Sequence, residues 1–254
     1  MGSSGNAAKK QRLDKMLSHI GVGSRSDIRK LAKQGLIHVN GAVVKDSGIH
    51  VDPYNDKVEV NGEVVTYREY IYLMMNKPPD VLSATEDKRD RTVLDLLKPE
   101  YAQFEPFPVG RLDKDTVGLL LLTNDGKLAH ELLSPRKHVP KIYEATVEGE
   151  VDADDVAAFA TGVELEDGYV TLPAQLTILS RQRGTTTISF ISLMITEGKF
   201  HQVKRMFQAV GKKVTFLKRV SMGELKLDEN LALGAYRELT KEELNLLSAG
   251  APEL

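Results

Sequence analysis

The chain has 254 residues, with 34 Lys plus Arg against 36 Asp plus Glu, and this near-neutral sum at first disfavours a nucleic-acid binder. Its 41% hydrophobic and 28% charged residues are typical of a globular protein, and the absence of cysteine excludes disulfides, thiolate zinc sites and a cysteine nucleophile. No apolar run reaches the roughly 18 residues of a membrane helix, so we predict a cytoplasmic protein with no membrane partner.

The N-terminal quarter of the sequence predicts a small module. Residues 1–9 lack the apolar core of a signal peptide and are predicted to be a tag or a disordered arm. Within residues 10–66, apolar residues spaced by three and four predict a helix from Gln11. Ser24 then has the character of an N-cap for a second helix that extends to about Gln34.

Two β-hairpins are predicted to follow these helices. The segment LIHVNGAVV alternates apolar residues around Asn40-Gly41, and KVEVNGEVV repeats the pattern around Asn61-Gly62. Asn-Gly favours a type I′ turn, in which both central residues need positive φ. The module is therefore expected to pair two helices with a small sheet.

Residues 69–247 predict a second, larger domain with longer elements. Apolar runs predict strands at 71–77, 118–123, 141–147, 186–195 and 213–220. Helices are predicted at 92–97, 127–133, 152–160 and 201–210, and from Thr240, which forms a capping box with Glu243. Because strands and helices do not alternate as regular βαβ units, we predict an α+β fold with a mixed, mainly antiparallel sheet.

The charge distribution reverses the first impression from the sum. Residues 9–45 contain nine basic and two acidic residues, and residues 199–219 contain seven basic and no acidic ones. One such cluster fits a solvated helix face as well as a binding surface. Two clusters with an acidic remainder favour a phosphate-binding face.

The first basic cluster lies in RLDKMLSHIGVGSRSDIRKLAKQGLIHVNGAVV, which closely resembles the S4 RNA-binding domain. The resemblance rests on the Arg-Leu-Asp-Lys start, the Ser-Arg that opens the second helix and the Gly-x-Ile-x-Val-Asn-Gly ending. A rigid basic face can recognise RNA by shape. The residues expected to contact phosphates are Arg12, Lys15, Arg25, Arg29 and Lys33. The alternative is a helical pair with ordinary surface charges.

A second motif, GRLDKDTVGLLLLT, contains Asp113 and Asp115 before a buried strand. From the residues alone, Asp113 fits a structural cap, part of a Mg²⁺ site with Asp115, or a covalent nucleophile held beside a cation. The second basic cluster offers such cations, but spacing does not decide which one approaches.

GRLDKDTVGLLLLTNDG also resembles the central motif of the pseudouridine synthases. NKPPDVLSAT, KIYEATV and EGKFHQVKRMF resemble the other motifs of that family, in the same order. An S4 module before such a core is the arrangement of the ribosomal RNA branch. Within it, LAHELLSPRKHVPKIYEATVEG and GVELEDGYVTLPAQL look most like the small-subunit enzyme. The resemblance therefore implies an S4-like domain at 10–66 and a catalytic domain at 69–247.

The resemblance implies conversion of a uridine to pseudouridine in 16S rRNA, either naked or in an assembling small subunit, by a monomer without metal or cofactor. It makes Asp113 the catalytic carboxylate, by a route left open, with Tyr143 against the base and Lys204 paired with Asp113 where many relatives have Arg. RNA contacts are expected from Arg111, His201 and Arg205, and for His201 a helix-capping contact is the other expectation.

Three alternatives remain at this point. The enzyme acts on 23S rRNA, the chain is a non-catalytic RNA-binding assembly factor that kept the fold, or it is a metal-dependent nuclease that uses Asp113 and Asp115.

Overall fold

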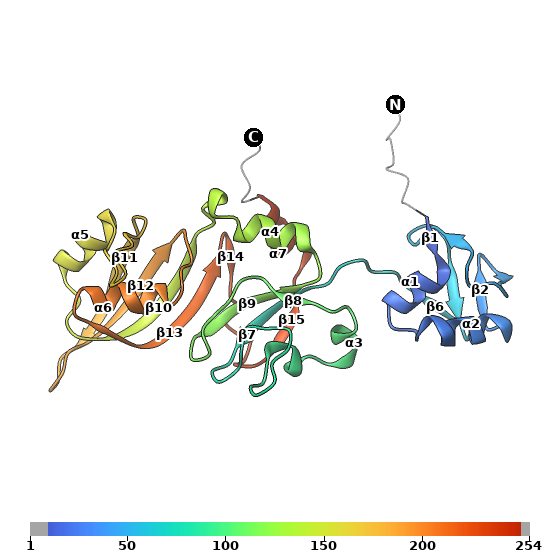
Figure 1. The fold of residues 1–254 in the computed structure, drawn as a ribbon, viewed down its shortest axis with the longest axis horizontal. Coiled ribbons are helices and arrows are strands. Elements are labelled where there is room, and N and C mark those ends of the chain that lie inside the picture. The colour runs from blue at the N-terminus through green and yellow to red at the C-terminus, as the bar shows by residue number, and fades with distance from the viewer. Residues whose placement is uncertain (1–9, 250–254) are drawn as a thin grey trace, which may run out of the picture. The chain divides into compact units, whose positions relative to one another are not determined.

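The structure is a computed structural model that describes residues 10–249, so the arm predicted at 1–9 lies outside the described residues. Two compact units are present (Figure 1): one contains the residues up to Ile71 together with 98–105, and the other contains 72–97 and the residues from Pro106 onwards. Within the described range, no helix has the length and apolar character needed to cross a membrane.

The smaller unit contains two helices and two small sheets from the residues up to Ile71. It also contains the segment 98–105, which includes the short helix α3. Its elements are β1 (Gln11–Arg12), α1 (Leu13–His19), α2 (Arg25–Lys33), β2 (Ile37–Val39), β3 (Ala42–Val43), β4 (His50–Val51), β5 (Val58–Val60), β6 (Glu63–Val65) and α3 (Pro99–Ala102). The sheets have the strand orders β3-β2-β5-β6 and β1-β4. Phe104, just after α3, meets His19 of α1 edge to face at 5.4 Å, which accounts for residues 98–105 belonging to this unit.

Local sequence signals explain most of this unit. The Ser24 side chain accepts the Asp27 N–H at the start of α2, as the N-cap pattern predicts. Both hairpin turns have positive φ at each central residue, 51° and 82° at Asn40-Gly41 and 54° and 82° at Asn61-Gly62. The first helix begins two residues later than predicted, because Arg12 is extended and pairs with β4.

The larger unit is built on one nine-stranded sheet. Its elements are β7 (Tyr72–Lys77), η1 (Val93–Leu96), β8 (Phe107–Pro108), β9 (Val117–Thr123), α4 (Gly126–Leu133), η2 (Pro135–Lys137), β10 (Lys141–Glu148), α5 (Ala153–Thr161), β11 (Gln175–Gln182), β12 (Ile188–Ile195), α6 (Gln202–Ala209), β13 (Lys213–Met222), β14 (Leu225–Lys226), β15 (Tyr236–Glu238) and α7 (Lys241–Ala249). The main path is β11-β12-β10-β13-β9-β7-β15. All of its pairs are antiparallel except β13 with β9, which confirms the predicted α+β class.

The parallel contact between β9 and β13 joins the two halves of this sheet. It is short, with Val117 opposite Lys218 and Gly118 opposite Arg219. Gly118 has a φ of +102°, and a Cβ there would lie 2.3 Å from the Arg219 carbonyl oxygen. Only glycine allows the strands to meet at this point. The junction brings the loop before β9 next to residues of β13.

The sequence analysis missed β11, the edge strand of the sheet. Of its eight residues only Leu176 is buried, and because an edge strand carries polar side chains on most positions its apolar pattern is weak. The predicted helix at 201–210 is α6, which packs on the neighbouring α5 through rings of Phe207 and Phe159 at 4.9 Å. Thr240 and Glu243 form the expected reciprocal bonds at α7.

Candidate active site

The loop that carries Asp113 is held on both sides by its neighbours. Gly110 turns the chain with a φ of +79°. Ser83 then brackets Leu112, because its Oγ accepts the Leu112 N–H at 3.1 Å and donates to the Leu112 carbonyl at 3.0 Å. The Asp113 carbonyl accepts the Thr116 N–H at 3.0 Å, which closes a tight turn into β9.

Lys77, at the end of β7, is a buried ammonium beneath this loop. Its Nζ donates to the carbonyls of Pro78 at 3.0 Å, Lys114 at 3.3 Å and Thr116 at 3.0 Å. Burial lowers the pKa of Lys77 to about 8, although Asp115 and Asp113 act in the opposite direction. Two of its acceptors flank Asp115, so Lys77 fixes the backbone on which both carboxylates are mounted.

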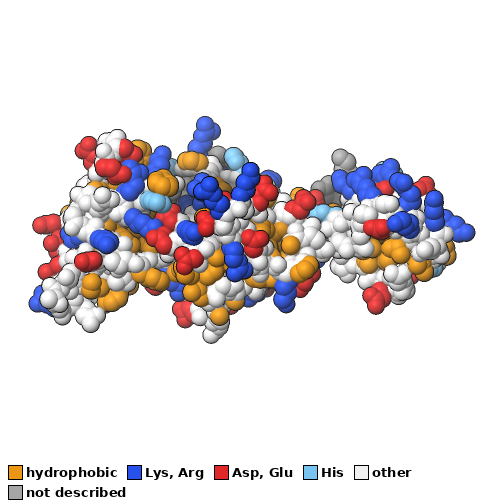
Figure 2. All heavy atoms as spheres, turned by 60° about the horizontal axis from the view of Figure 1, so that its bottom comes forward, with side chains coloured by type: hydrophobic (Ala, Val, Ile, Leu, Met, Phe, Trp, Pro, Cys, Tyr) orange, Lys and Arg blue, Asp and Glu red, His pale blue; other side chains and the backbone are white. Residues whose placement is uncertain are grey.

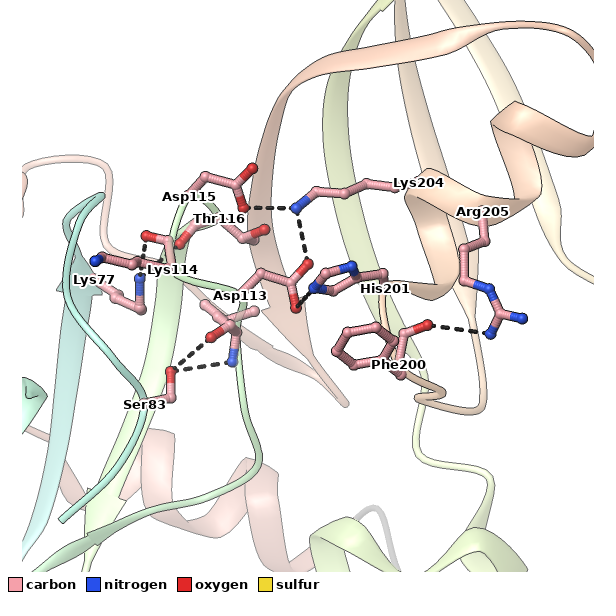
Figure 3. A network of polar contacts seen from close by, with 11 residues as sticks. Lys77, Ser83, Asp113, Lys114, Asp115, Thr116, Phe200, His201, Lys204 and Arg205 are labelled. Carbon is pink, nitrogen blue, oxygen red and sulfur yellow. Dashed lines mark hydrogen bonds and ion pairs between the residues drawn. The ribbon is translucent and has the colours of Figure 1, made fainter. Parts of the chain in front are cut away.

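Lys204 of α6 joins the two carboxylates of the loop (Figure 3). Its Nζ lies 2.9 Å from Asp113 Oδ2 and 2.6 Å from Asp115 Oδ1. Burial opposes the charge of Lys204, but its hydrogen bonds to Asp115 and Asp113 outweigh this effect and raise its pKa. For Asp115, burial raises the pKa, but the Lys204 bond and charge outweigh it and lower the pKa overall. The predicted Asp113–Lys204 pair is present, and Asp115 is an unpredicted third member.

His201 approaches Asp113 from the other side. Its Nε2 lies 3.6 Å from Asp113 Oδ1, and its ring stacks on the exposed Phe200 at 3.7 Å. The residue occupies the N-cap position of α6 with a φ of 48°, and its side chain makes no capping hydrogen bond. The capping alternative for His201 is therefore wrong, and its place is beside the carboxylate.

Tyr143 and Asp113 line the same hollow, which contains about 420 Å³ of empty space. Tyr143 is buried, on the β10 strand beside β13, and Leu217 and Ile195 add apolar walls. Arg111, which the sequence analysis assigned to RNA, is exposed at the same hollow. The site thus combines a flat aromatic ring, apolar walls and a half-exposed carboxylate.

This arrangement suits chemistry on a planar polar ring without a second substrate. The raised pKa of Lys204 keeps an ammonium beside Asp113 throughout the neutral range. A carboxylate beside such a cation can attack an electrophilic carbon or accept a proton. Within residues 10–249, no group of three or more acidic or histidine side chains is placed to hold a metal ion.

The remaining predicted RNA contacts differ in their surroundings. Arg205 is 14% exposed and pairs with Glu166 at 2.7 Å and Asp167 at 2.6 Å. Arg12 pairs with the buried Asp14 at 2.7 Å. The predicted contacts on α1 and α2, which are Lys15, Arg25, Arg29 and Lys33, are all exposed. Figure 2 shows Lys and Arg side chains gathered on the smaller unit, and their contact with RNA stays a prediction.

Four further residues take part in or beside the site, and the sequence analysis missed their roles. They are Lys77, Ser83, Lys141 and Arg219. Lys77 and Lys141 lie inside motifs that we singled out, so a basic residue at the end or start of a buried strand was the available signal. Ser83 lies in the same motif as Lys77, but nothing there distinguishes it from an ordinary loop serine.

Comparison with known proteins agrees with this geometry. The RNA pseudouridylate synthase family model matches residues 71–209, and the S4 domain model matches residues 11–53. The chain belongs to the RNA pseudouridylate synthase family, and it is an isomerase that makes pseudouridine in RNA.

Several individual proteins are similar along nearly their whole length. The uncharacterized RNA pseudouridine synthase YtzG of Bacillus subtilis (strain 168) is 56% identical over 93% of this chain and 98% of its own. Ribosomal large subunit pseudouridine synthase B of the same organism is 41% identical, covering 94% and 96%. Ribosomal small subunit pseudouridine synthase A of Yersinia pestis is also 41% identical, covering 96% and 100%. A crystal structure of a pseudouridylate synthase superposes with a TM-score of 0.64 at 35% identity, covering 93% and 99%.

Proposed function

We propose that this protein converts one uridine of 16S ribosomal RNA to pseudouridine, with Asp113 as the catalytic carboxylate. The observation that carries the proposal is the contact of Asp113 with Lys204 at 2.9 Å, at a hollow that Tyr143 also lines. A half-exposed carboxylate of this kind is free on one side to meet a base or a sugar.

The reaction needs one bond broken and one bond made on the same sugar. The bond between N1 of uracil and C1′ breaks, the uracil turns while it stays in the hollow, and C5 bonds to C1′. The proton on C5 then leaves, and N1 ends with a proton. Asp113 assists bond cleavage, and Tyr143 holds the ring and is placed to assist removal of the C5 proton. Because nothing is oxidised and no phosphate is transferred, we propose a reaction without metal or cofactor.

The target uridine has to leave its stack to reach this hollow. We propose that exposed Arg111 takes the place of the extruded base or holds the adjacent RNA. His201 and Arg205 are proposed to contact RNA from α6, which for Arg205 requires exchange of its bonds to Glu166 and Asp167. Basic residues of α1 and α2 then hold flanking RNA by its phosphates.

The choice of 16S RNA rests on the segment from Gly162 to Leu176, whose sequence looks most like the small-subunit enzyme. This segment adjoins the site. The Tyr169 hydroxyl donates to Glu197 at 2.6 Å, and the Leu172 N–H donates to the same carboxylate at 2.9 Å. Residues here are well placed to contact nucleotides around the target. We also propose that the protein is a monomer, because Asp113, Tyr143 and Lys204 come from one chain. We propose that it acts in the cytoplasm on small-subunit RNA, either naked or in an assembling subunit.

The test is pseudouridine mapping in ribosomal RNA from cells with and without the protein, by carbodiimide labelling. We expect one site in 16S RNA to disappear in the deletion strain and to return with the wild-type gene. The gene carrying Asp113→Asn should leave it absent. A restored site with that variant would remove Asp113 from its role, and unchanged maps would contradict the proposed substrate.

A second candidate substrate is 23S RNA, which the 41% identity to a large-subunit synthase favours. The same maps separate the two, because the missing pseudouridine would then lie in 23S RNA.

A further inference from the structure

A second hollow of about 970 Å³ shares a wall with the candidate active site. Arg111, Tyr143 and Lys199 line both hollows. The second hollow continues to Lys141, Arg219 and the segment around Pro135. Neither Lys141 nor Arg219 has a part in the chemistry proposed for Asp113.

Arg219 is one of the residues that line this hollow, and its guanidinium is buried. The residue is 2% exposed, and its Nε donates to the Leu119 carbonyl at 2.8 Å. One terminal nitrogen is fully buried and, among the residues that the structure describes, has no hydrogen-bond partner. A buried guanidinium normally has its donors satisfied by a carboxylate or several carbonyls. The free donor of Arg219 therefore marks a position for an acceptor that the chain does not supply.

Lys141 brings a second cation to the same wall. It lies two residues before Tyr143 on β10, so both side chains project from one face, and Tyr143 is opposite Arg219 on β13. Its Nζ donates to the Val139 carbonyl at 3.0 Å. Burial, and then the charge of Arg219, lower the pKa of Lys141 to about 8. The two cations thus repel each other in a desolvated place.

The acidic residue at this hollow has other partners. Glu197 accepts bonds from the Tyr169 hydroxyl, the Leu172 N–H and Gln202 Nε2. Within residues 10–249, neither Lys141 nor Arg219 forms an ion pair with a carboxylate. Two desolvated cations without an internal counter-ion favour an anion over a neutral carbonyl.

We propose that Arg219 and Lys141 form a subsite for a phosphodiester group of the RNA strand, next to the nucleotide in the active site. The location rests on the proposed function, since the two hollows share Arg111 and Tyr143. The forked guanidinium supplies a directed donor to a phosphate oxygen, and the ammonium supplies a point charge. A phosphate bound here fixes the position of the RNA strand beside the active site. This position sets the orientation in which the uridine reaches Asp113.

The first experiment measures binding with the full chain. Affinity for a five-residue oligouridylate is compared among wild type, Lys141→Met and Lys226→Met, the last a matched control at an exposed lysine of β14. Lys141→Met keeps the apolar stem and removes only the charge, so the variant is expected to fold. We expect it to bind at least about tenfold more weakly and with a shallower salt dependence, and the control to bind as wild type. Equal affinity of Lys141→Met and wild type overturns the proposal.

The second experiment identifies the group that is bound. The same oligouridylate is made with one neutral methylphosphonate linkage at each position in turn. At one position the neutral linkage should weaken binding to the wild type. It should not weaken binding to Lys141→Met further, because that variant has already lost the charge pair. Additive losses at every position overturn the phosphate assignment. Arg219→Lys serves as a second variant that retains charge but loses the fork, and it should show the same position dependence in weaker form.

A spectroscopic readout separates this subsite from a structural role. In protein with ¹³C-labelled lysine side chains, the Lys141 signal should titrate near pH 8, and saturating oligouridylate should move its midpoint upward by about one unit or more. An unmoved midpoint with bound oligouridylate contradicts the proposal. None of these readouts requires turnover, so the subsite can stand if no pseudouridine is made, and pseudouridine can be made if the subsite fails.

Discussion

The basic residues of the two units are used differently. On α1 and α2 of the smaller unit, Lys15, Arg25, Arg29 and Lys33 are exposed. In the larger unit Arg111 is exposed at the site, but Lys77 is held by three carbonyls and Lys204 by two carboxylates. Exposed cations act additively on a polyanion and are screened by salt, whereas desolvated cations fix geometry and charge at one place.

The net charge of −2 therefore hides two different uses of basic residues. One function is affinity for RNA along a surface. The other is the placement of a carboxylate, which the surface charge does not influence. Variants in the two units should therefore separate binding from turnover.

The largest expected effect is on turnover, from Asp113→Asn. Replacement of the carboxylate removes the group that we propose to assist bond cleavage, so kcat should fall by about a thousandfold or more while RNA affinity stays within about twofold. Single-turnover pseudouridine formation on 16S RNA measures it. Asp115→Asn is the matched control, because Asp115 bonds the same ammonium and is 72% exposed. A loss in the control as large as in Asp113→Asn would contradict the distinction between the two carboxylates.

The next effect is expected from Lys204→Met. Loss of the ammonium leaves Asp113 and Asp115 as neighbouring carboxylates without a shared cation, so kcat should fall by about a hundredfold, with little change in KM. Lys204→Arg keeps the charge and should recover most of the activity. A rise in KM with unchanged kcat would instead assign Lys204 to RNA binding.

Lys77→Met tests the support beneath the loop and is expected to affect stability first. It leaves three carbonyls without their charged donor, at a cost of about 2 kcal/mol, and a looser loop should lower kcat by about tenfold. Thermal and urea unfolding measure the loss of stability.

The same variant has a defined pH dependence. The pKa of Lys77 is about 8 in the folded chain and 10.5 for an ordinary lysine, so the unfolded state binds more protons between these values. The Lys77 contribution to stability therefore rises with pH from about 8 to about 10.5. The difference in unfolding free energy between wild type and Lys77→Met should grow across this window. A difference that does not vary with pH would contradict the lowered pKa.

The smallest effect on chemistry is expected from the smaller unit. Replacement of Arg25, Arg29 and Lys33 by Gln removes exposed charges, so KM should rise severalfold while kcat is unchanged. The slope of log affinity against log salt should become shallower by about 2, since each phosphate contact contributes about 0.7 to 0.9. Filter binding at several salt concentrations measures this. An unchanged slope would mean that α2 does not face RNA.

Much of the fold was predictable because its signals are local. The N-cap at Ser24, the Asn-Gly turns and the capping box of Thr240 with Glu243 each depend on a few adjacent residues, and the structure has all three. The Asp113–Lys204 pair came from the motif resemblance, not from spacing, because 91 residues separate the two.

The sequence by itself determined most of the longer elements, the α+β class, the two basic clusters and the candidate carboxylate, since each is encoded in a short pattern or a motif. Only the tertiary structure added Asp115 and His201 to the Asp113–Lys204 pair and showed which cations remain without an anion. Lys77, Lys141 and Arg219 come from β7, β10 and β13 of one sheet, in which β9 lies between β7 and β13 and meets β13 closely at Gly118. Burial and contacts with distant residues set the electrostatic surroundings of these side chains. Both depend on how distant segments pack, and not on the neighbouring residues in the chain.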